Sequence, residues 1–110
     1  MGAKASQKCE AFLCYMNFFI YIIYSPSVDQ FYVGQTIDLI ERINQHNNAF
    51  FENSSTKKGI PWEIYFKLEC STRNQAILIE NHIKRMKSRK YYSSLLLYPE
   101  ISEKLLLRFL

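Results

Sequence analysis

The chain has 110 residues, which is enough for one compact domain and too short for two. Apolar residues make up 48% of it and charged residues 22%, a globular composition that excludes an intrinsically disordered chain. The net charge of +4 and the isoelectric point near 9.0 favour a polyanionic partner, although many ordinary proteins are equally basic.

The number and spacing of the cysteines indicate the redox compartment of the protein. The chain has three, Cys9, Cys14 and Cys70, and no two of them have the close spacing of a disulfide framework or a zinc site, so neither is predicted. We expect free thiols in a reducing, cytoplasmic environment. No run reaches the roughly 20 apolar residues of a membrane span, and the N-terminus lacks the pattern of a signal peptide, so no membrane association is expected.

The first part of the chain predicts a β-hairpin behind an N-terminal extension. Residues 1–16 have no clear period and are expected to be a poorly ordered lead-in. Phe18–Tyr24 is a run of aromatic and β-branched residues, typical of a buried strand, and Ser25-Pro26-Ser27 ends it with a turn. Phe31–Gly34 is a second short strand, close enough to pair antiparallel with the first.

A helix is expected after the hairpin. Thr36 can cap it, and Asp38 and Glu41 place negative charge in its first turns, where the helix dipole favours it. Asn47-Asn48 suits its end, and the polar segment 49–59 is predicted to be a surface loop. The predicted apolar stripe consists of Leu39, Ile40 and Ile43.

A third strand is predicted at Glu63–Glu69, opened by Pro61-Trp62. Alternate side chains of a strand share a face. The predicted apolar face of this strand consists of Ile64, Phe66 and Leu68.

A second, longer helix should follow. Thr72 and Gln75 have the spacing of a capping box, with Ser71 as a rival cap. The helix is expected to run to about Arg89, and residues 91–97 can extend it. Its predicted buried stripe consists of Ala76, Ile79, Ile83 and Met86.

The order strand, strand, helix, strand, helix predicts an α+β fold with a small three-stranded antiparallel sheet flanked by helices. Residues 17–98 are expected to form the domain. Residues 99–110, which open with Pro99, are expected to be a tail or a short closing helix.

Asp38, Arg42 and His46 are spaced by four residues and share one face of the first predicted helix. Arg42 and His46 lie at the border of its apolar stripe, where a side chain can be held rigidly and still reach a groove. A guanidinium is a fixed bidentate donor for phosphate, and an imidazole can donate or shuttle a proton. On spacing alone, a solvated helix face is the commoner explanation.

Glu80 lies at the edge of the stripe predicted to be buried in the second helix. A carboxylate there is costly unless it is paired or bound to a cation. Spacing alone favours a salt bridge to Lys84, one turn on. The alternative is a ligand for Mg²⁺, which often takes one or two carboxylates and completes its coordination with water and phosphate.

Five positive charges lie close together at the end of this helix, at Lys84, Arg85, Lys87, Arg89 and Lys90. Tyr91 and Tyr92 follow at once. The cluster predicts either a surface for a phosphate backbone, with aromatic rings that could stack, or an ordinary solubilising face.

Gly34 is one of only three glycines and precedes a predicted helix N-terminus. A glycine there lets a phosphate or another strand approach closely. Gln35 beside it is a further candidate for contact with nucleic acid. Tyr21 and Tyr32 lie on the paired strands, where a tyrosine is usually a core or rim residue.

These pieces, in this order, resemble the GIY-YIG nuclease superfamily, in particular its small single-domain bacterial members. Ile20-Tyr21 stands where the GIY element stands, with Phe19 in place of its glycine, and Tyr32-Val33-Gly34 is a close variant of YIG. The arginine of the strand–helix segment that follows is Arg42, and its histidine is His46.

Later segments extend the resemblance. Pro61-Trp62-Glu63 and the segment that begins at Glu80 look like the remaining blocks, so the match covers roughly Asn17 to Tyr92. At Gln35 some branches carry a lysine, and no residue here is placed on the family's downstream asparagine.

The resemblance implies metal-dependent hydrolysis of phosphodiester bonds, with DNA as the expected nucleic acid. By analogy, Glu80 is the sole protein ligand of one Mg²⁺ or Mn²⁺ ion, which polarises the scissile phosphate and stabilises the leaving oxygen. Tyr32 would be the general base or proton relay, and Arg42 would hold the phosphate oxygens. Tyr21 and His46 would orient water or share the proton transfer.

Two alternatives to an endonuclease stay open: a nucleic-acid-binding module that does not cut, and a catalytic subunit that needs a partner chain for targeting. The intact set of Tyr32, Arg42, His46 and Glu80 favours the enzyme. Branched, damaged or foreign DNA is the expected substrate, in keeping with a role in DNA repair. A partner could dock on residues 105–110, although core packing is the more common fate of such leucines.

Overall fold

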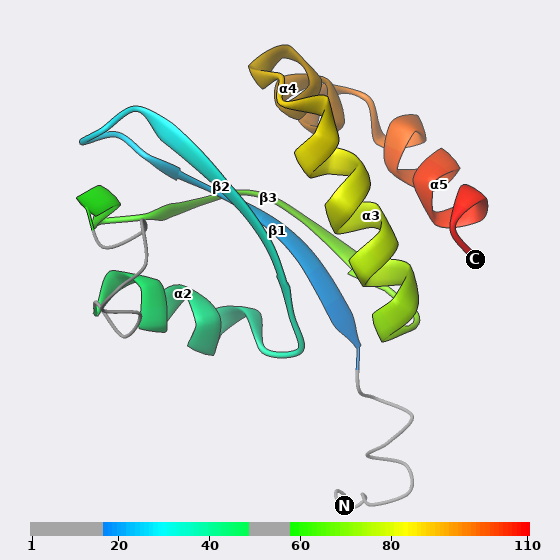
Figure 1. The fold of residues 1–110 in the computed structure, drawn as a ribbon, viewed down its shortest axis with the longest axis horizontal. Coiled ribbons are helices and arrows are strands. Elements are labelled where there is room, and N and C mark those ends of the chain that lie inside the picture. Colours follow the sequence, from blue (N-terminus) through cyan, green and yellow to red (C-terminus); the bar gives the residue numbers. More distant parts are fainter. Residues whose placement is uncertain (1–16, 49–57) are drawn as a thin grey trace, which may run out of the picture.

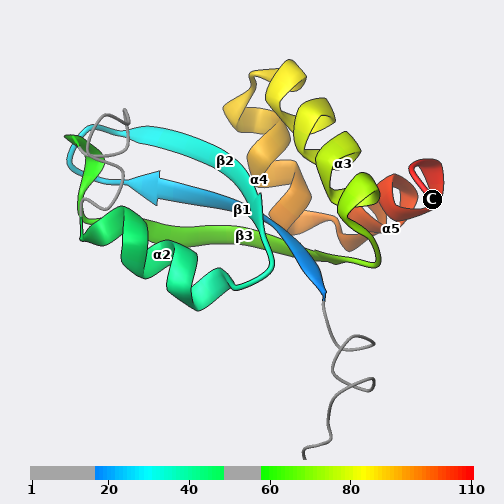
Figure 2. The same cartoon turned by 60° about the horizontal axis from the view of Figure 1, so that its bottom comes forward.

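A computed structural model of the chain describes residues 17–48 and 58–110. The strands are β1 (Phe18–Ser25), β2 (Gln30–Thr36) and β3 (Glu63–Cys70), and they form one antiparallel sheet in the order β2-β1-β3. The helices are α2 (Leu39–Asn47), α3 (Arg73–Met86), α4 (Arg89–Leu97) and α5 (Pro99–Arg108). Helix α2 covers one face of the sheet, and α3, α4 and α5 gather on the other (Figures 1 and 2). The predicted α+β fold is therefore confirmed, while the lead-in 1–16 and residues 49–57 of the predicted loop lie outside the described residues.

The central strand β1 supplies side chains to two separate cores. Ile20 and Ile22 pack in the larger core against the α3–α5 layer, whereas Tyr21 and Ile23 pack in a smaller core with Trp62 on the side of α2. Both faces of this strand are buried, which explains why its sequence is a continuous apolar run without polar alternation. One of the side chains that faces α2 is a tyrosine, and this places a polar group inside the smaller core.

A β-bulge in β3 overturns part of the predicted alternation. Ile22 pairs with Phe66 and Ile23 pairs with Ile64, so Tyr65 is the extra residue. Phe66 and Leu68 join the larger core as predicted, but Ile64 is 48% exposed, and Tyr65 packs in that core instead. Because a bulge adds one residue to one strand, every side chain before it changes face.

Helix α2 begins later than predicted. Asp38, not Thr36, is its N-cap, and the Asp38 carboxylate accepts a hydrogen bond from the Glu41 backbone N–H at 3.1 Å. Thr36 is buried at the end of β2 and bonds to the backbone of Asp38. Ile40 is 75% exposed, which leaves Leu39 and Ile43 as the apolar stripe. The helix ends at Asn47 with Asn48 as its C-cap, as predicted.

Helix α3 ends at Met86, earlier than the sequence indicates. Lys87 adopts a left-handed conformation (φ 45°), which ends the helix, and Ser88 caps the separate helix α4. Met86 is 43% exposed and does not belong to the buried stripe, whereas Ala76, Ile79 and Ile83 are fully buried. At the other end Thr72 is the N-cap as predicted.

Helix α5 packs on the larger core through Leu105, and the buried Gln75 side chain of α3 donates a hydrogen bond to the Leu106 carbonyl at 2.9 Å. Leu107 and Leu110 are exposed. None of the described helices has the length and apolar character needed to cross a membrane. Cys70, the one described cysteine, is a buried free thiol, as predicted.

Candidate active site

The Tyr21 side chain crosses the edge strand of the sheet directly above Gly34. These two residues are cross-strand partners, and a Cβ atom at Gly34 would lie 2.5 Å from the Tyr21 hydroxyl and 2.6 Å from Cζ. Any larger residue at this position would displace the ring. The close approach that the sequence predicted at Gly34 is thus made by a tyrosine of the neighbouring strand.

Three rings from three elements meet at this position. The Tyr21 hydroxyl lies 3.0 Å from Nε2 of His46, on the last turn of α2. The ring centroid of Tyr32, from β2, lies 5.1 Å from that of His46 and 6.4 Å from that of Tyr21. His46 is only 2% exposed, so it does not belong to a solvated helix face.

Burial fixes the protonation of the Tyr21–His46 pair. Burial raises the pKa of the Tyr21 phenol to about 12, with a further contribution from the nearby Tyr32 hydroxyl. Burial, and then the positive charge of Arg42, lower the pKa of His46 to about 4. Near neutral pH the phenol therefore keeps its proton and the imidazole is neutral, so the hydrogen bond between them joins two uncharged groups.

Arg42 is half-buried on α2, one turn before His46. Its charge and its hydrogen bond to the Tyr21 phenol both act to lower the pKa of Tyr21, against the larger effect of burial. The same charge lowers the pKa of His46. A guanidinium in this place supplies a fixed positive charge beside the Tyr21 hydroxyl and the His46 imidazole, an arrangement that suits a phosphate.

Glu80 approaches from the opposite layer, on α3. Its side chain is 15% exposed and pairs with Lys84 at 2.8 Å, so the predicted salt bridge exists. Its charge also raises the pKa of Tyr21, the weakest of the effects on that group, so the carboxylate acts on Tyr21 through its charge. The fold brings Tyr21, Tyr32, Arg42 and His46 together on the α2 side of the sheet, and Glu80 acts on Tyr21 from α3.

The donor set near Glu80 limits the kind of metal that the site can hold. No group of three or more His, Cys, Asp or Glu side chains with metal-binding geometry occurs within residues 17–48 and 58–110. An ion there would rest on the Glu80 carboxylate, with water and substrate oxygens as its other ligands. Mg²⁺ and Mn²⁺ can bind through one carboxylate with water and phosphate oxygens as the other ligands, whereas a structural zinc site needs four protein ligands.

Residues 17–92 match the family model of the GIY-YIG catalytic domain. The chain belongs to the GIY-YIG superfamily. No curated protein and no solved structure matches it. Membership gives this GIY-YIG domain a nuclease-type function with nucleic acid as its general substrate, in a family that generally uses divalent metals.

All five clustered basic residues of the GIY-YIG domain are exposed, and they extend from α3 to the start of α4: Lys84, Arg85, Lys87, Arg89 and Lys90. Arg89 is engaged within the protein, because its guanidinium bonds to Asp29 and lies 5.1 Å from the centroid of Phe31.

The adjoining tyrosines are not exposed stacking platforms. Tyr92 packs on Phe31 with centroids 5.2 Å apart, Tyr91 packs on His82 at 6.0 Å, and both contribute to the larger core. Gln35 is half-buried on β2, and its Oε1 atom has no hydrogen-bond partner among the described residues.

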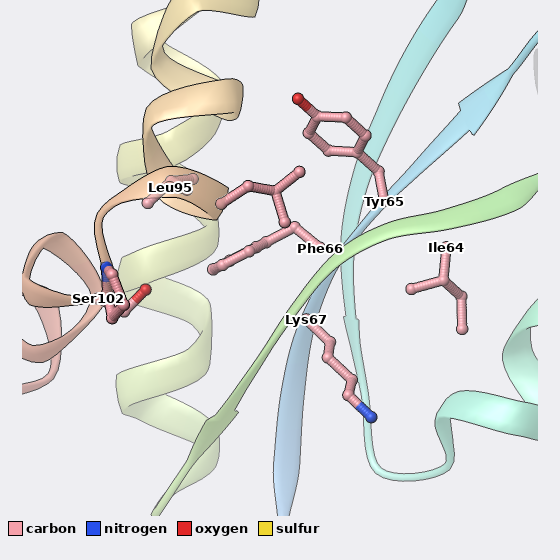
Figure 3. A pocket seen from close by; sticks show the side chains of 8 residues that line it. Ile64, Tyr65, Phe66, Lys67, Leu95 and Ser102 are labelled. Carbon is pink, nitrogen blue, oxygen red and sulfur yellow. The ribbon is translucent and has the colours of Figure 1, made fainter.

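Two cavities lie away from these residues. One, of about 440 Å³, lies between β3 and the α4–α5 pair, with Phe66 and Leu95 directed toward each other across it (Figure 3). The other, of about 320 Å³, lies beside the start of α2. Their linings are mainly apolar, and neither includes Tyr21 or any of the four residues that act on it.

Two residues of the GIY-YIG domain that lie beside Tyr32 and His46 are not among the site residues predicted from the sequence, although Trp62 belongs to one of the segments that carry the family resemblance. Trp62 is 6% exposed, and its ring centroid lies 6.4 Å from that of Tyr32. Asn47 was assigned only to the helix end, but its side chain bonds to both backbone groups of Trp62. An asparagine next to a candidate histidine was the available signal, although spacing alone does not reveal its partner.

The buried His46 should make the folded domain sensitive to acid. Its pKa is about 4 in the folded state and ordinarily about 6.5, so the unfolded chain binds the extra proton first as the pH falls. The stabilisation is complete above pH 6.5 and is lost as the pH approaches 4. We expect urea denaturation to show a loss of about 3 kcal/mol between pH 7 and pH 4 from this group.

The control for this experiment is His46→Gln, whose amide can still accept a bond from Tyr21. The other histidine, His82, also has a lowered pKa and remains in both proteins, so the difference between them reports on His46. An equal loss of stability in the two proteins would contradict the assignment of a neutral, buried His46.

Proposed function

We propose that this protein is a metal-dependent endonuclease that hydrolyses phosphodiester bonds in DNA. The observation that carries the proposal is the convergence on one buried phenol: Tyr21 is bonded to His46 and is affected electrostatically by Tyr32, Arg42 and Glu80. A general base, a phosphate-binding guanidinium and a carboxylate for a hard cation are the groups that such a reaction requires.

Each group has a distinct part in the proposal. Tyr32, half-buried at the edge strand, accepts the proton of the attacking water. Arg42 binds the non-bridging oxygens, and its charge balances the charge that develops on them. Tyr21 is hydrogen-bonded to His46 and thereby fixes the imidazole, which orients the water or receives its proton.

Glu80 is the proposed ligand of a Mg²⁺ or Mn²⁺ ion, which when bound polarises the scissile phosphate and stabilises the leaving oxygen. The carboxylate now pairs with Lys84, whose side chain is 49% exposed. A cation on the carboxylate would replace the ammonium group as its partner, and Lys84 would then be available for a phosphate of the same strand.

The exposed basic residues supply the proposed contacts with the DNA backbone. Lys84 follows Glu80 by four residues on the same flank of α3, and Lys87 is the exposed residue that directly follows the helix. We expect the double variant Lys84→Gln, Lys87→Gln to bind DNA more weakly. The logarithm of its association constant should fall less steeply with the logarithm of salt concentration, by about one unit for each lost phosphate contact.

Arg89→Gln is the control for this salt titration, because Arg89 is bonded to Asp29 and stacked on Phe31. It should lower the stability of the fold and leave the salt dependence unchanged. The opposite result would be a changed salt dependence in Arg89→Gln and an unchanged one in the double variant. It would indicate that DNA binds at the start of α4 and not along the end of α3.

The proposed function is tested by cleavage of a panel of labelled substrates: single-stranded, duplex, flap and four-way-junction DNA, with matched RNA. Each is incubated with Mg²⁺, with Mn²⁺ and with a chelator. Cutting of DNA that requires the metal supports the proposal, and the preferred substrate shape then defines its specificity. Salt-sensitive binding without cutting under any condition would identify a binding module or a subunit that needs a partner chain.

A further inference from the structure

The amide of Asn47 joins the end of α2 to the start of β3. Its Nδ2 donates to the Trp62 carbonyl at 3.1 Å, and its Oδ1 accepts from the Trp62 backbone N–H at 2.5 Å. One side chain thus satisfies both backbone groups of a residue fifteen positions away, as a neighbouring strand would. Asn47 directly follows His46, which bonds to Tyr21.

The Trp62 side chain is closely enclosed. A Cβ atom at Gly59 would lie 2.2 Å from Cζ2 of this ring, so the ring occupies the space that a side chain at Gly59 would need. Trp62 packs in the smaller core with Tyr21 and Ile23, and Tyr32 packs against this core. The position of the Trp62 backbone therefore determines where its ring contacts Tyr32.

Tyr32 has the Trp62 ring and the His46 ring as neighbours, with interplanar angles of 61° and 63°. Asn47 directly follows His46 in the chain and holds the backbone of Trp62 through two hydrogen bonds. From this geometry we infer that Asn47 is a positioning residue, which holds the Tyr32 phenol through Trp62. The inference rests on the proposed function in one respect, namely that Tyr32 takes part in the reaction.

If Asn47 only stabilises the fold, its loss should have the same effect as the loss of any equivalent pair of hydrogen bonds, so a matched control is needed. Gln75 provides it, because its amide also accepts from one backbone N–H, of Ser71 at 2.8 Å, and donates to one carbonyl, of Leu106 at 2.9 Å. It makes these bonds in the α3–α5 layer, on the other side of the sheet. Gln75→Ala therefore removes an equivalent pair of hydrogen bonds without touching Trp62.

Trp62 is the single tryptophan of the chain, so its fluorescence reports on this position directly. For Asn47→Ala we expect a several-fold rise in quenching of this fluorescence by acrylamide. The ¹³Cζ signal of Tyr32 in tyrosine-labelled protein, assigned with Tyr32→Phe, should also shift. Asn47→Asp keeps the acceptor and loses the donor, so it should fall between Asn47→Ala and the wild type. Gln75→Ala should leave both signals in place.

In the cleavage assay, at a temperature where all variants are folded, Asn47→Ala should lower kcat by about tenfold or more, because a misplacement of about 1 Å can cost up to 10²-fold. Gln75→Ala should keep the wild-type kcat. The inference is overturned if Asn47→Ala leaves the Tyr32 signal unchanged, or if Gln75→Ala shifts it equally. If the wild type does not cut, the proposed function fails, and the Tyr32 signal alone decides the role of Asn47.

Discussion

Replacement of Glu80 by glutamine is expected to lower metal-dependent DNA cleavage by about 10³-fold or more, while the protein stays folded. The carboxylate is the proposed protein ligand of the cation, and glutamine keeps its size but not its charge. A bound metal ion contributes several kcal/mol to the stabilisation of the transition state, and each 1.36 kcal/mol is a factor of ten in rate. The measurement is single-turnover cleavage of a labelled duplex or junction across a series of Mn²⁺ concentrations.

The control is Lys84→Gln, which breaks the same ion pair and keeps the carboxylate. A partly exposed pair at this helical spacing contributes only about 0.3–0.5 kcal/mol, so both variants should unfold within a narrow range of the wild type. Lys84→Gln should raise the DNA concentration needed for half-maximal rate and keep metal-dependent turnover at saturation. Binding of Mn²⁺ in the presence of DNA, followed by electron paramagnetic resonance, should weaken in Glu80→Gln alone.

Full activity of Glu80→Gln would contradict the assignment of the cation site. A second result is equally informative: if both variants lose activity together, the ion pair itself is required, and Lys84 acts in the reaction and not only in binding. The two residues lie one turn apart on α3, so a comparison of the two variants separates the effect of losing the carboxylate from the effect of losing the ion pair.

The elements of the sheet were predictable from the sequence because local pattern determines them. The run Phe18–Tyr24 has bulky apolar residues at every position, and a strand between two layers needs this. The cap at Thr72 was also predictable, since its spacing to Gln75 is a local property of the chain.

The errors arose where one residue changes the geometry. The extra residue Tyr65 in β3 moved Ile64 to the other face, and the left-handed Lys87 ended α3 before Arg89. Lys87 is not a glycine, the residue that usually marks a left-handed conformation, and the segment around Tyr65 contains none either, so neither change has a local sign in the sequence.

The convergence of the site is a property of the sheet register, and spacing along the chain does not contain it. Tyr21 reaches His46 only because it lies opposite Gly34, where no side chain blocks the ring. On spacing alone, a solvated face for His46 and a simple ion pair for Glu80 were the better explanations, and the ion pair does exist. The resemblance to a family, and not the periodicity, singled out the histidine that is buried beside Tyr21.

The contrast between the two tyrosines is the sharper test of the proposed chemistry. Tyr32→Phe keeps the ring contacts with His46 and Trp62 and removes one hydroxyl group. Since general base catalysis contributes about 10²–10⁴-fold, the rate of the chemical step should fall within that range, with DNA binding unchanged. Single-turnover cleavage with the affinity measured in a chelator separates the two quantities.

Tyr21→Phe removes a hydroxyl group from the same cluster and should have a smaller effect on the chemical step. Because its pKa is raised to about 12, the Tyr21 phenol stays protonated near neutral pH and cannot act as a general base. Its part is instead to hold His46 in place through the hydrogen bond of 3.0 Å. Loss of that bond leaves His46 less restrained, so the reaction is slowed through position and not through proton transfer. If Tyr21→Phe abolishes cleavage and Tyr32→Phe retains most of the rate, the roles of the two tyrosines are reversed, and Arg42, which lowers the pKa of Tyr21, becomes the group that activates the base.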